Sequence, residues 1–187
     1  HACYAQIFSK KAKSHPYELD IPRSLETKFD LQGGLIFIAD EAEDQPLNFL
    51  LDTGAPTLIL NESISANRSA TRVVGVNGAA TISNKKVKDF SVQGLPIGNM
   101  RSYLTDLSSI EAIKKKAITG ILGYKVLKAF ELFIDYDRRY LMLFEQGASD
   151  LHAFIQPVEA IPLHVKGHFP IVKVKIGKRT YFFAIDT

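Results

Sequence analysis

One short segment of the chain has residue types in an order that could support acid–base chemistry. Residues 49–51 are apolar, and they lead directly into Asp52, Thr53 and Gly54. A carboxylate at the end of a buried strand is costly unless hydrogen bonds hold it. The Thr53 hydroxyl and the Gly54 backbone amide can supply such bonds. An ordinary turn at a strand end would explain the same tripeptide, so its surroundings decide between the two interpretations.

The segment recurs later in the chain. Residues 33–53 align without a gap with residues 167–187, at the offset of 134 positions that separates Asp52 from Asp186. Both copies end an apolar strand on Asp-Thr, and the second copy ends at Thr187. Identities are few and chance is the alternative, but the shared ending favours a true repeat. The sequence therefore predicts two equivalent carboxylates.

The elements that must position these residues are mostly strands. Apolar runs predict strands at 35–39, 47–51, 57–60, 87–92, 101–107, 131–135 and 139–144, with a turn at 94–99. Asn77-Gly78 lies between β-favouring flanks, a strong hairpin signal. Helices are expected only at 110–116, with Ser109 as the N-cap, and at 124–130. Many short strands with little helix predict an all-β sandwich or barrel.

Composition argues against several other classes of protein. The 187 residues are 46% hydrophobic and carry a net charge of only +3, with scattered lysines, so no nucleic-acid partner is expected. Cys3 is the single cysteine, which excludes an intrachain disulfide and a thiolate metal site. His164 and His168 are four residues apart within a strand-like pattern, so we expect no metal and no cofactor. No apolar run approaches the roughly 20 residues that span a bilayer.

The motifs after Asp52 follow an order that resembles the retropepsin-like aspartic peptidases. In that family Asp-Thr-Gly-Ala follows an apolar strand, as residues 52–55 do here. An apolar pair followed by glycine packs beside the catalytic loop, as Ile121-Leu122-Gly123 would, and a short helix follows. A glycine-bearing hairpin covers the substrate as a flap; the matching residues are Gly75, Val76, Asn77 and Gly78. The resemblance covers roughly residues 33–145 and implies a retropepsin- or pepsin-like acid protease β-barrel lobe.

The resemblance also implies a mechanism. Asp52 and Asp186 would form a dyad that shares one proton and activates water for cleavage of a polypeptide substrate. Residues supporting the catalytic loops would be Thr53, Gly54, Thr187 and Gly123. Neither a metal nor a covalent intermediate is needed.

The chain departs from the retroviral members of the family. Tyr124 stands where they place arginine, the lobe is longer, and a second copy begins. It looks closer to bacterial secreted aspartyl peptidases with two lobes in one chain, often followed by a PDZ module. The expected organisation is an N-terminal extension over 1–30, a first lobe over 31–146, and a linker with the first strands of a truncated second lobe over 147–187. Small residues near the start, with a plausible cleavage point after Ala5, match the end of a secretory signal, so an exported protein is expected.

Two other interpretations stay open at this stage. The lobe could bind peptides without cleaving them, or two copies of Asp52 could meet in a catalytic homodimer. The intact Asp52 and the repeated Asp-Thr favour the two-lobe enzyme. Unpaired strands of an incomplete second lobe would also promote self-association.

Overall fold

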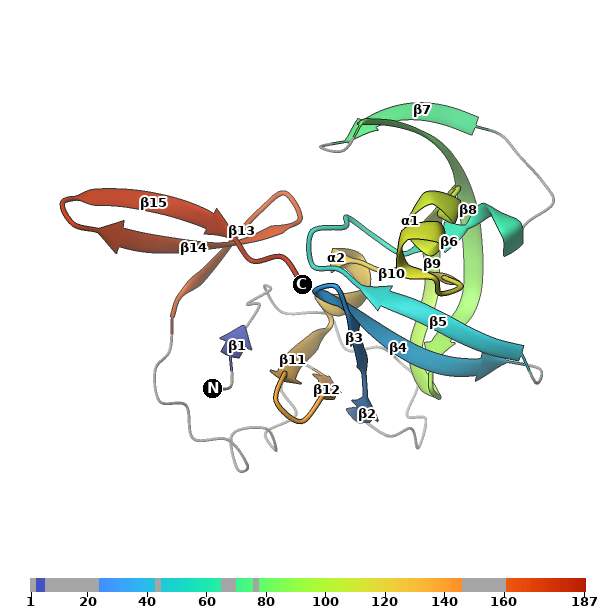
Figure 1. Cartoon of the computed structure of the whole chain (residues 1–187), viewed down its shortest axis with the longest axis horizontal. Helices are drawn as coiled ribbons and strands as arrows, with labels where there is room; N and C mark the ends of the chain where they lie inside the picture. The colour runs from blue at the N-terminus through green and yellow to red at the C-terminus, as the bar shows by residue number, and fades with distance from the viewer. Residues whose placement is uncertain (1–2, 6–23, 43–44, 65–69, 76–77, 146–160) are drawn as a thin grey trace.

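The computed structural model describes residues 3–5, 24–42, 45–64, 70–75, 78–145 and 161–187 (Figure 1). Within these ranges strands dominate, and the two α-helices are short: α1 (Ser108–Lys114) and α2 (Tyr124–Leu127). A 3-10 turn, η1 (Glu62–Ile64), follows the strand β6 (Ile59–Asn61). The all-β class predicted from the sequence is confirmed for the described residues.

An eight-stranded sheet forms the main part of the first lobe. In spatial order its strands are β3 (Asp30–Gln32), β4 (Leu35–Ala42), β5 (Gln45–Leu51), β10 (Gly120–Leu122), β6 (Ile59–Asn61), β9 (Leu95–Thr105), β8 (Gly78–Val92) and β7 (Ala70–Gly75). β10 lies between β5 and β6, parallel to the first and antiparallel to the second. Leu122 is opposite Leu51, so the residues that follow β5 and β10 leave the sheet side by side.

A four-stranded antiparallel sheet closes the core from the other side. Its spatial order is β1 (Cys3–Ala5), β11 (Phe130–Asp135), β12 (Tyr140–Glu145) and β2 (Ser24–Lys28). The alternating burial of Phe130, Leu132 and Ile134 turns one face of β11 inward. β2 comes from the segment expected to be an N-terminal extension, yet it pairs with β12 and buries Leu25.

One apolar core joins these two sheets. Its members come from both, and they include Ile36, Ile38, Phe49, Leu51, Leu132 and Leu143. Ile38 and Leu51 are fully buried, and burial of such a side chain contributes roughly 1.5–3 kcal/mol.

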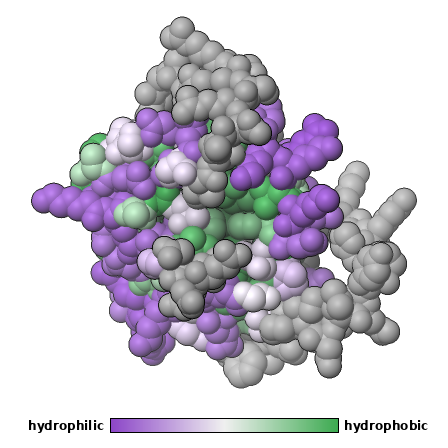
Figure 2. Space-filling view, turned by 90° about the vertical axis from the view of Figure 1, so that its right-hand side faces the viewer, coloured by the Kyte–Doolittle hydropathy of each residue, from purple (hydrophilic) through white to green (hydrophobic). Residues whose placement is uncertain are grey.

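Figure 2 views the molecule from the side on which β8 lies in Figure 1. Apolar surface gathers at its centre, within a rim of hydrophilic side chains.

Several predicted boundaries were wrong for local reasons. The helix expected over 124–130 stops at Leu127, because the buried Phe130 follows the two-residue period of β11. α1 begins at Ser108 rather than after Ser109, and the Asp106 carboxylate accepts the Ser108 N–H at 2.8 Å. The turn expected over 94–99 is confined to Gln93 and Gly94, which both have positive φ angles of 47° and 79°. Such a pair connects β8 to β9 as a tight hairpin.

A separate three-stranded sheet, β13 (Leu163–Lys166), β14 (Phe169–Ile176) and β15 (Arg179–Ala184), repeats β3, β4 and β5. β14 and β15 begin 134 positions after β4 and β5, the offset between the two Asp-Thr pairs. The register repeats as well, since Phe37 is opposite Leu50 and Ile171 is opposite Ala184. The turns that precede β4 and β14 both contain a left-handed glycine, with φ of 57° at Gly33 and 68° at Gly167. The repeat is therefore present in the backbone.

Candidate active site

The loop that carries Asp52 is held by its own backbone amides. Asp52 Oδ1 accepts the N–H of Gly54 at 2.7 Å and the N–H of Ala55 at 3.0 Å. The Asp52 N–H donates to the Leu122 carbonyl at 3.2 Å, which ties the end of β5 to the end of β10. The carboxyl therefore has a fixed orientation at the exit of two parallel strands.

Gly123 packs directly against this loop. A Cβ atom at this position would lie 2.6 Å from the Ala55 carbonyl oxygen and would also collide with the Thr57 carbonyl. The next residue, Tyr124, donates its N–H to the Ala55 carbonyl at 2.8 Å. Only glycine lets the start of α2 approach the loop this closely.

The two Asp-Thr copies interlock with a local two-fold relationship. Thr53 Oγ1 donates to the Ile185 carbonyl at 2.8 Å, and Thr187 Oγ1 lies 3.4 Å from the Leu51 carbonyl. In each case the threonine hydroxyl reaches the residue two positions before its counterpart. The Thr53 N–H also donates to Thr187 Oγ1 at 3.2 Å. The interlock brings the ends of β5 and β15 together.

The Asp52 and Asp186 carboxyls lie next to each other at this junction. A Cβ atom on Gly54 would be 2.8 Å from Asp186 Oδ1 and 3.1 Å from Asp52 Oδ1. Burial raises the pKa of Asp52, and the Asp186 charge and a side-chain hydrogen bond with Asp186 raise it further. The N–H groups of Gly54 and Ala55 act in the opposite direction. Such a pair can hold one proton between an acid and a carboxylate.

The structure thus brings together six of the residues singled out from the sequence, namely Asp52, Thr53, Gly54, Gly123, Asp186 and Thr187. The hairpin expected as a flap is formed by β7 and β8, with Gly75 opposite Gly78. Its tip residues, Val76 and Asn77, lie outside the described residues.

Sequence reasoning missed the polar residues that fix β10 in the sheet. Asn61 is only 3% exposed; its side-chain amide donates to the Ile118 carbonyl at 2.9 Å and accepts the Leu107 N–H at 3.4 Å. Thr119 Oγ1 accepts the Asn48 N–H at 2.9 Å, and the Thr119 N–H donates to the Asn48 carbonyl at 2.8 Å. The signal in the sequence was a polar residue, Asn61, at the end of an apolar strand.

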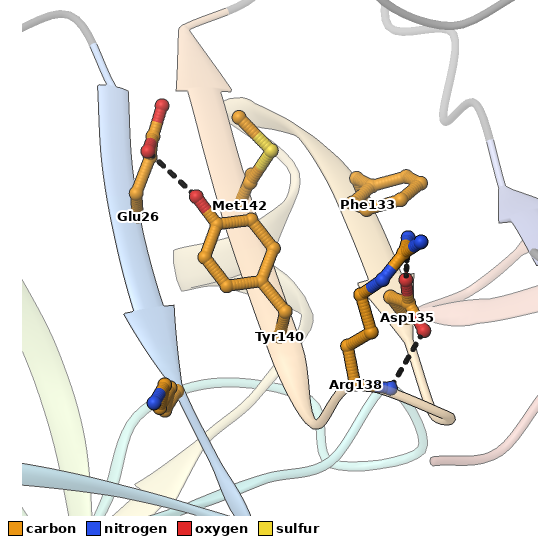
Figure 3. A pocket seen from close by; sticks show the side chains of 7 residues that line it. Glu26, Phe133, Asp135, Arg138, Tyr140 and Met142 are labelled. Atoms are coloured by element: carbon orange, nitrogen blue, oxygen red, sulfur yellow. Dashed lines mark hydrogen bonds and ion pairs between the residues drawn. The ribbon is translucent and has the colours of Figure 1, made fainter.

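A hollow elsewhere on the first lobe contains neither aspartate. It lies on the outer face of the four-stranded sheet, over Phe133, Tyr140 and Met142 (Figure 3). A hydrogen bond and an ion pair lie at its border. The Tyr140 hydroxyl donates to the Glu26 carboxylate at 2.6 Å, and the Arg138 guanidinium pairs with the Asp135 carboxylate at 3.1 Å. Across the described part of the chain, no cluster of three or more His, Cys, Asp or Glu side chains could hold a metal ion. No described helix is long and apolar enough to cross a membrane.

Part of this chain is similar to known proteins. Residues 41–126 match the family model described as aspartyl protease, a span that includes the Asp52 loop and Gly123. A solved structure of a retropepsin-like aspartic protease from Rickettsia conorii is similar at 18% identity, over 63% of this chain and 98% of that one, with a TM-score of 0.45. No curated protein gives a significant match.

The family match and the strand-rich fold point in the same direction. Residues 41–126 are similar to the aspartyl protease family, and this similarity supports a protease function.

Proposed function

We propose that the chain is an aspartic endopeptidase in which Asp52 and Asp186 form the catalytic dyad. The observation that carries the proposal is the interlock of the two Asp-Thr copies, which brings both carboxyls to one side of Gly54. Carboxyls this close can share a proton, because ionising both would place two negative charges next to each other.

In the proposed reaction the ionised member of the dyad removes a proton from a water molecule as that water attacks the peptide carbonyl. The protonated member donates a hydrogen bond to the oxygen on which negative charge develops. The resulting tetrahedral intermediate then breaks its C–N bond, and the leaving nitrogen takes a proton from the dyad. Thr53 and Thr187 keep the two carboxyls in register, and the Gly54 N–H orients Asp52.

The substrate proposed is an extended polypeptide. The β7–β8 hairpin belongs to the same sheet as β5, and it would cover a chain lying across the dyad. Cleavage within such a chain, rather than at its ends, is the endopeptidase part of the proposal.

The test is cleavage of an unstructured polypeptide by the wild-type protein and by Asp52→Asn and Asp186→Asn. Asn is nearly isosteric with Asp but cannot exchange the proton, so each variant should lose at least about 10²–10⁴-fold in kcat. Asp89→Asn, a change at an exposed residue outside the site, serves as the control and should retain full activity. Circular dichroism should show that all three variants are folded.

Other outcomes would point to the other interpretations. Full activity of Asp52→Asn would contradict the peptidase proposal and favour a peptide-binding lobe. Loss of activity in Asp52→Asn alone, with an active and dimeric Asp186→Asn, would favour a homodimer that pairs two copies of Asp52.

A further inference from the structure

One face of the main sheet carries a continuous apolar row across neighbouring strands. Leu50 in β5 lies opposite Ile121 in β10, which lies opposite Ile59 in β6. Ile59 in turn lies opposite Tyr103 in β9, and β8 follows β9 in the sheet (Figure 1). The row thus begins two positions before Asp52 and leads toward β9 and β8.

The row is buried beside the dyad and becomes more accessible toward β9. Leu50 and Ile121 are buried in one apolar cluster with Ala55, which belongs to the loop that follows β5. Ile59 and Tyr103 are only partly buried. An extended chain that crosses the dyad can therefore place side chains on the outer part of the row.

Two basic side chains lie beside the outer end of this row. Ser102 and Leu104 are buried on the core side of β9. The alternation of the strand therefore projects Arg101 and Tyr103 from the opposite face, which is the face of the apolar row. Lys86 in β8 lies directly opposite Arg101, and both side chains are exposed. Because residues directly opposite each other share a face, Lys86 projects from this face as well.

Backbone contacts fix this part of β9 against the segment that follows the Asp52 loop. The Thr57 hydroxyl donates to the Arg101 carbonyl at 3.1 Å, and the Tyr103 N–H donates to the Leu58 carbonyl at 2.9 Å. Thr57 is only 2% exposed, so the first of these bonds lies inside the packed lobe. The backbone thus holds Arg101 at a set position relative to the dyad.

The two basic groups repel each other. Like charges directly opposite each other in a sheet are destabilising. In the described part of the chain, neither Arg101 nor Lys86 forms an ion pair with an acidic side chain. A carboxylate between them would remove the repulsion, and a guanidinium group can hold a carboxylate through two parallel hydrogen bonds. The arrangement is therefore suited to a carboxylate that comes from a bound molecule.

We propose that Arg101 and Lys86 bind an acidic side chain of the polypeptide substrate. This inference rests on the proposed function, because it names the class of substrate that the same site prefers. β9 is three strand spacings away from β5, which is about 14 Å. An extended chain covers that distance in about four residues. The protein therefore favours cleavage of bonds that have Asp or Glu within about four residues on one side.

The experiment maps, by mass spectrometry, the bonds that the 187-residue chain cleaves in a library of unstructured peptides with randomised sequences. Near the bonds cleaved by the wild-type chain, Asp and Glu should be enriched about two- to fivefold over their frequency in the library, as expected for an exposed ion pair. The double variant Arg101→Gln/Lys86→Gln should lose this enrichment at the bonds that it cleaves. Lys28→Gln removes the same charge from an exposed strand residue of the four-stranded sheet and should keep the enrichment.

Charge reversal gives a result that a loss of folding cannot produce. Arg101→Glu should enrich Lys and Arg, in place of Asp and Glu, at the same positions. For the wild-type chain, about 1 M salt should reduce the enrichment, because exposed charges are then screened. Equal enrichment in the wild-type chain and the double variant, or an enrichment that Arg101→Glu leaves unchanged, would overturn the inference.

A binding measurement separates this inference from the proposed function. Asp52→Asn is titrated with two fluorescent peptides of alternating serine and valine that differ only in a central Glu or Gln. The Glu peptide should bind about two- to fivefold more tightly, and adding Arg101→Gln and Lys86→Gln should remove the difference. Selective binding without any cleavage by the wild-type chain would refute the proposed function alone. Cleavage without enrichment of acidic residues, and with equal binding of the two peptides, would refute the acidic preference alone.

Discussion

Among the individual residues, Asp52 has neighbours that shift its pKa in opposite directions. Burial and the neighbouring Asp186 raise its pKa, while the amides of Gly54 and Ala55 stabilise its ionised form. Burial is the largest of these influences, so the folded protein holds a proton on Asp52 at pH values where the unfolded chain has lost it. This difference links the site to the stability of the fold.

The linkage predicts how stability changes with pH. Because the folded pKa of Asp52 is raised, its contribution to the free energy of unfolding is fully present below the ordinary value of 3.8 and is lost as pH rises through the folded value. Asp52→Asn lacks this dependence, so the variant should gain stability relative to wild type as pH rises over that window. Urea denaturation from pH 3 to neutrality, in steps of about half a unit, measures the difference.

Asp106 serves as a control, because its pKa is shifted in the opposite direction. The Ser108 N–H lowers the pKa of Asp106, so this carboxylate stabilises the fold above its unfolded pKa, and the contribution is lost as pH falls. Asp106→Asn should therefore lose stability relative to wild type as pH rises. If both variants change in the same direction, burial does not dominate at Asp52.

At the scale of the element, β10 is the strand on which the site depends. It is three residues long, and all three are buried. Its parallel pairing with β5 places Gly123 behind the Asp52 loop. Such a short strand needs fixed ends, and Asn61 and Thr119 provide hydrogen bonds just before it begins.

Replacement of Asn61 with Ala should destabilise the protein by about 1–3 kcal/mol, because it leaves the buried Ile118 carbonyl and Leu107 N–H without their partner. Asn84→Ala is the matched control: Asn84 is an exposed strand residue, and its replacement should change stability by no more than about 0.5 kcal/mol. Thermal and urea denaturation measure both variants. Equal effects of the two changes would rule out Asn61 as the residue that fixes β10.

At the scale of the whole molecule, the two copies of the repeat have the same backbone register and different burial. Ile38 and Phe49 lie in a core closed by two sheets, whereas Val172 and Phe183 lie on a three-stranded sheet whose face is largely exposed within the described part of the chain. Local opening should therefore cost much less free energy in the second copy.

Hydrogen exchange can compare the copies position by position. The amides of Val172 and Phe183 should exchange at least about tenfold faster than those of Ile38 and Phe49, because the second sheet opens without unfolding the first lobe. The equivalent positions serve as internal controls, since Ile38 is opposite Phe49 in the same register in which Val172 is opposite Phe183. Equal protection in both copies would mean that the β13–β15 sheet unfolds only together with the first lobe.

The strand-rich class and the candidate carboxylates could be predicted from the sequence alone. Alternating apolar residues and the Asn-Gly turn are local signals, and they were sufficient for the all-β prediction. The repeat that relates Asp52 to Asp186 could also be recognised, because a sequence repeat is detected from the order of residue types alone.

How these segments pack against one another could not be predicted from the sequence and is seen in the three-dimensional structure. The insertion of β10 between β5 and β6 joins segments far apart in the chain, and no local pattern specifies such a pairing. Burial likewise ended α2 at Leu127, since Phe130 belongs to the core face of β11. Similar strand patterns also gave a buried face in the first copy and an exposed one in the second, because burial depends on what packs against a strand as well as on its sequence.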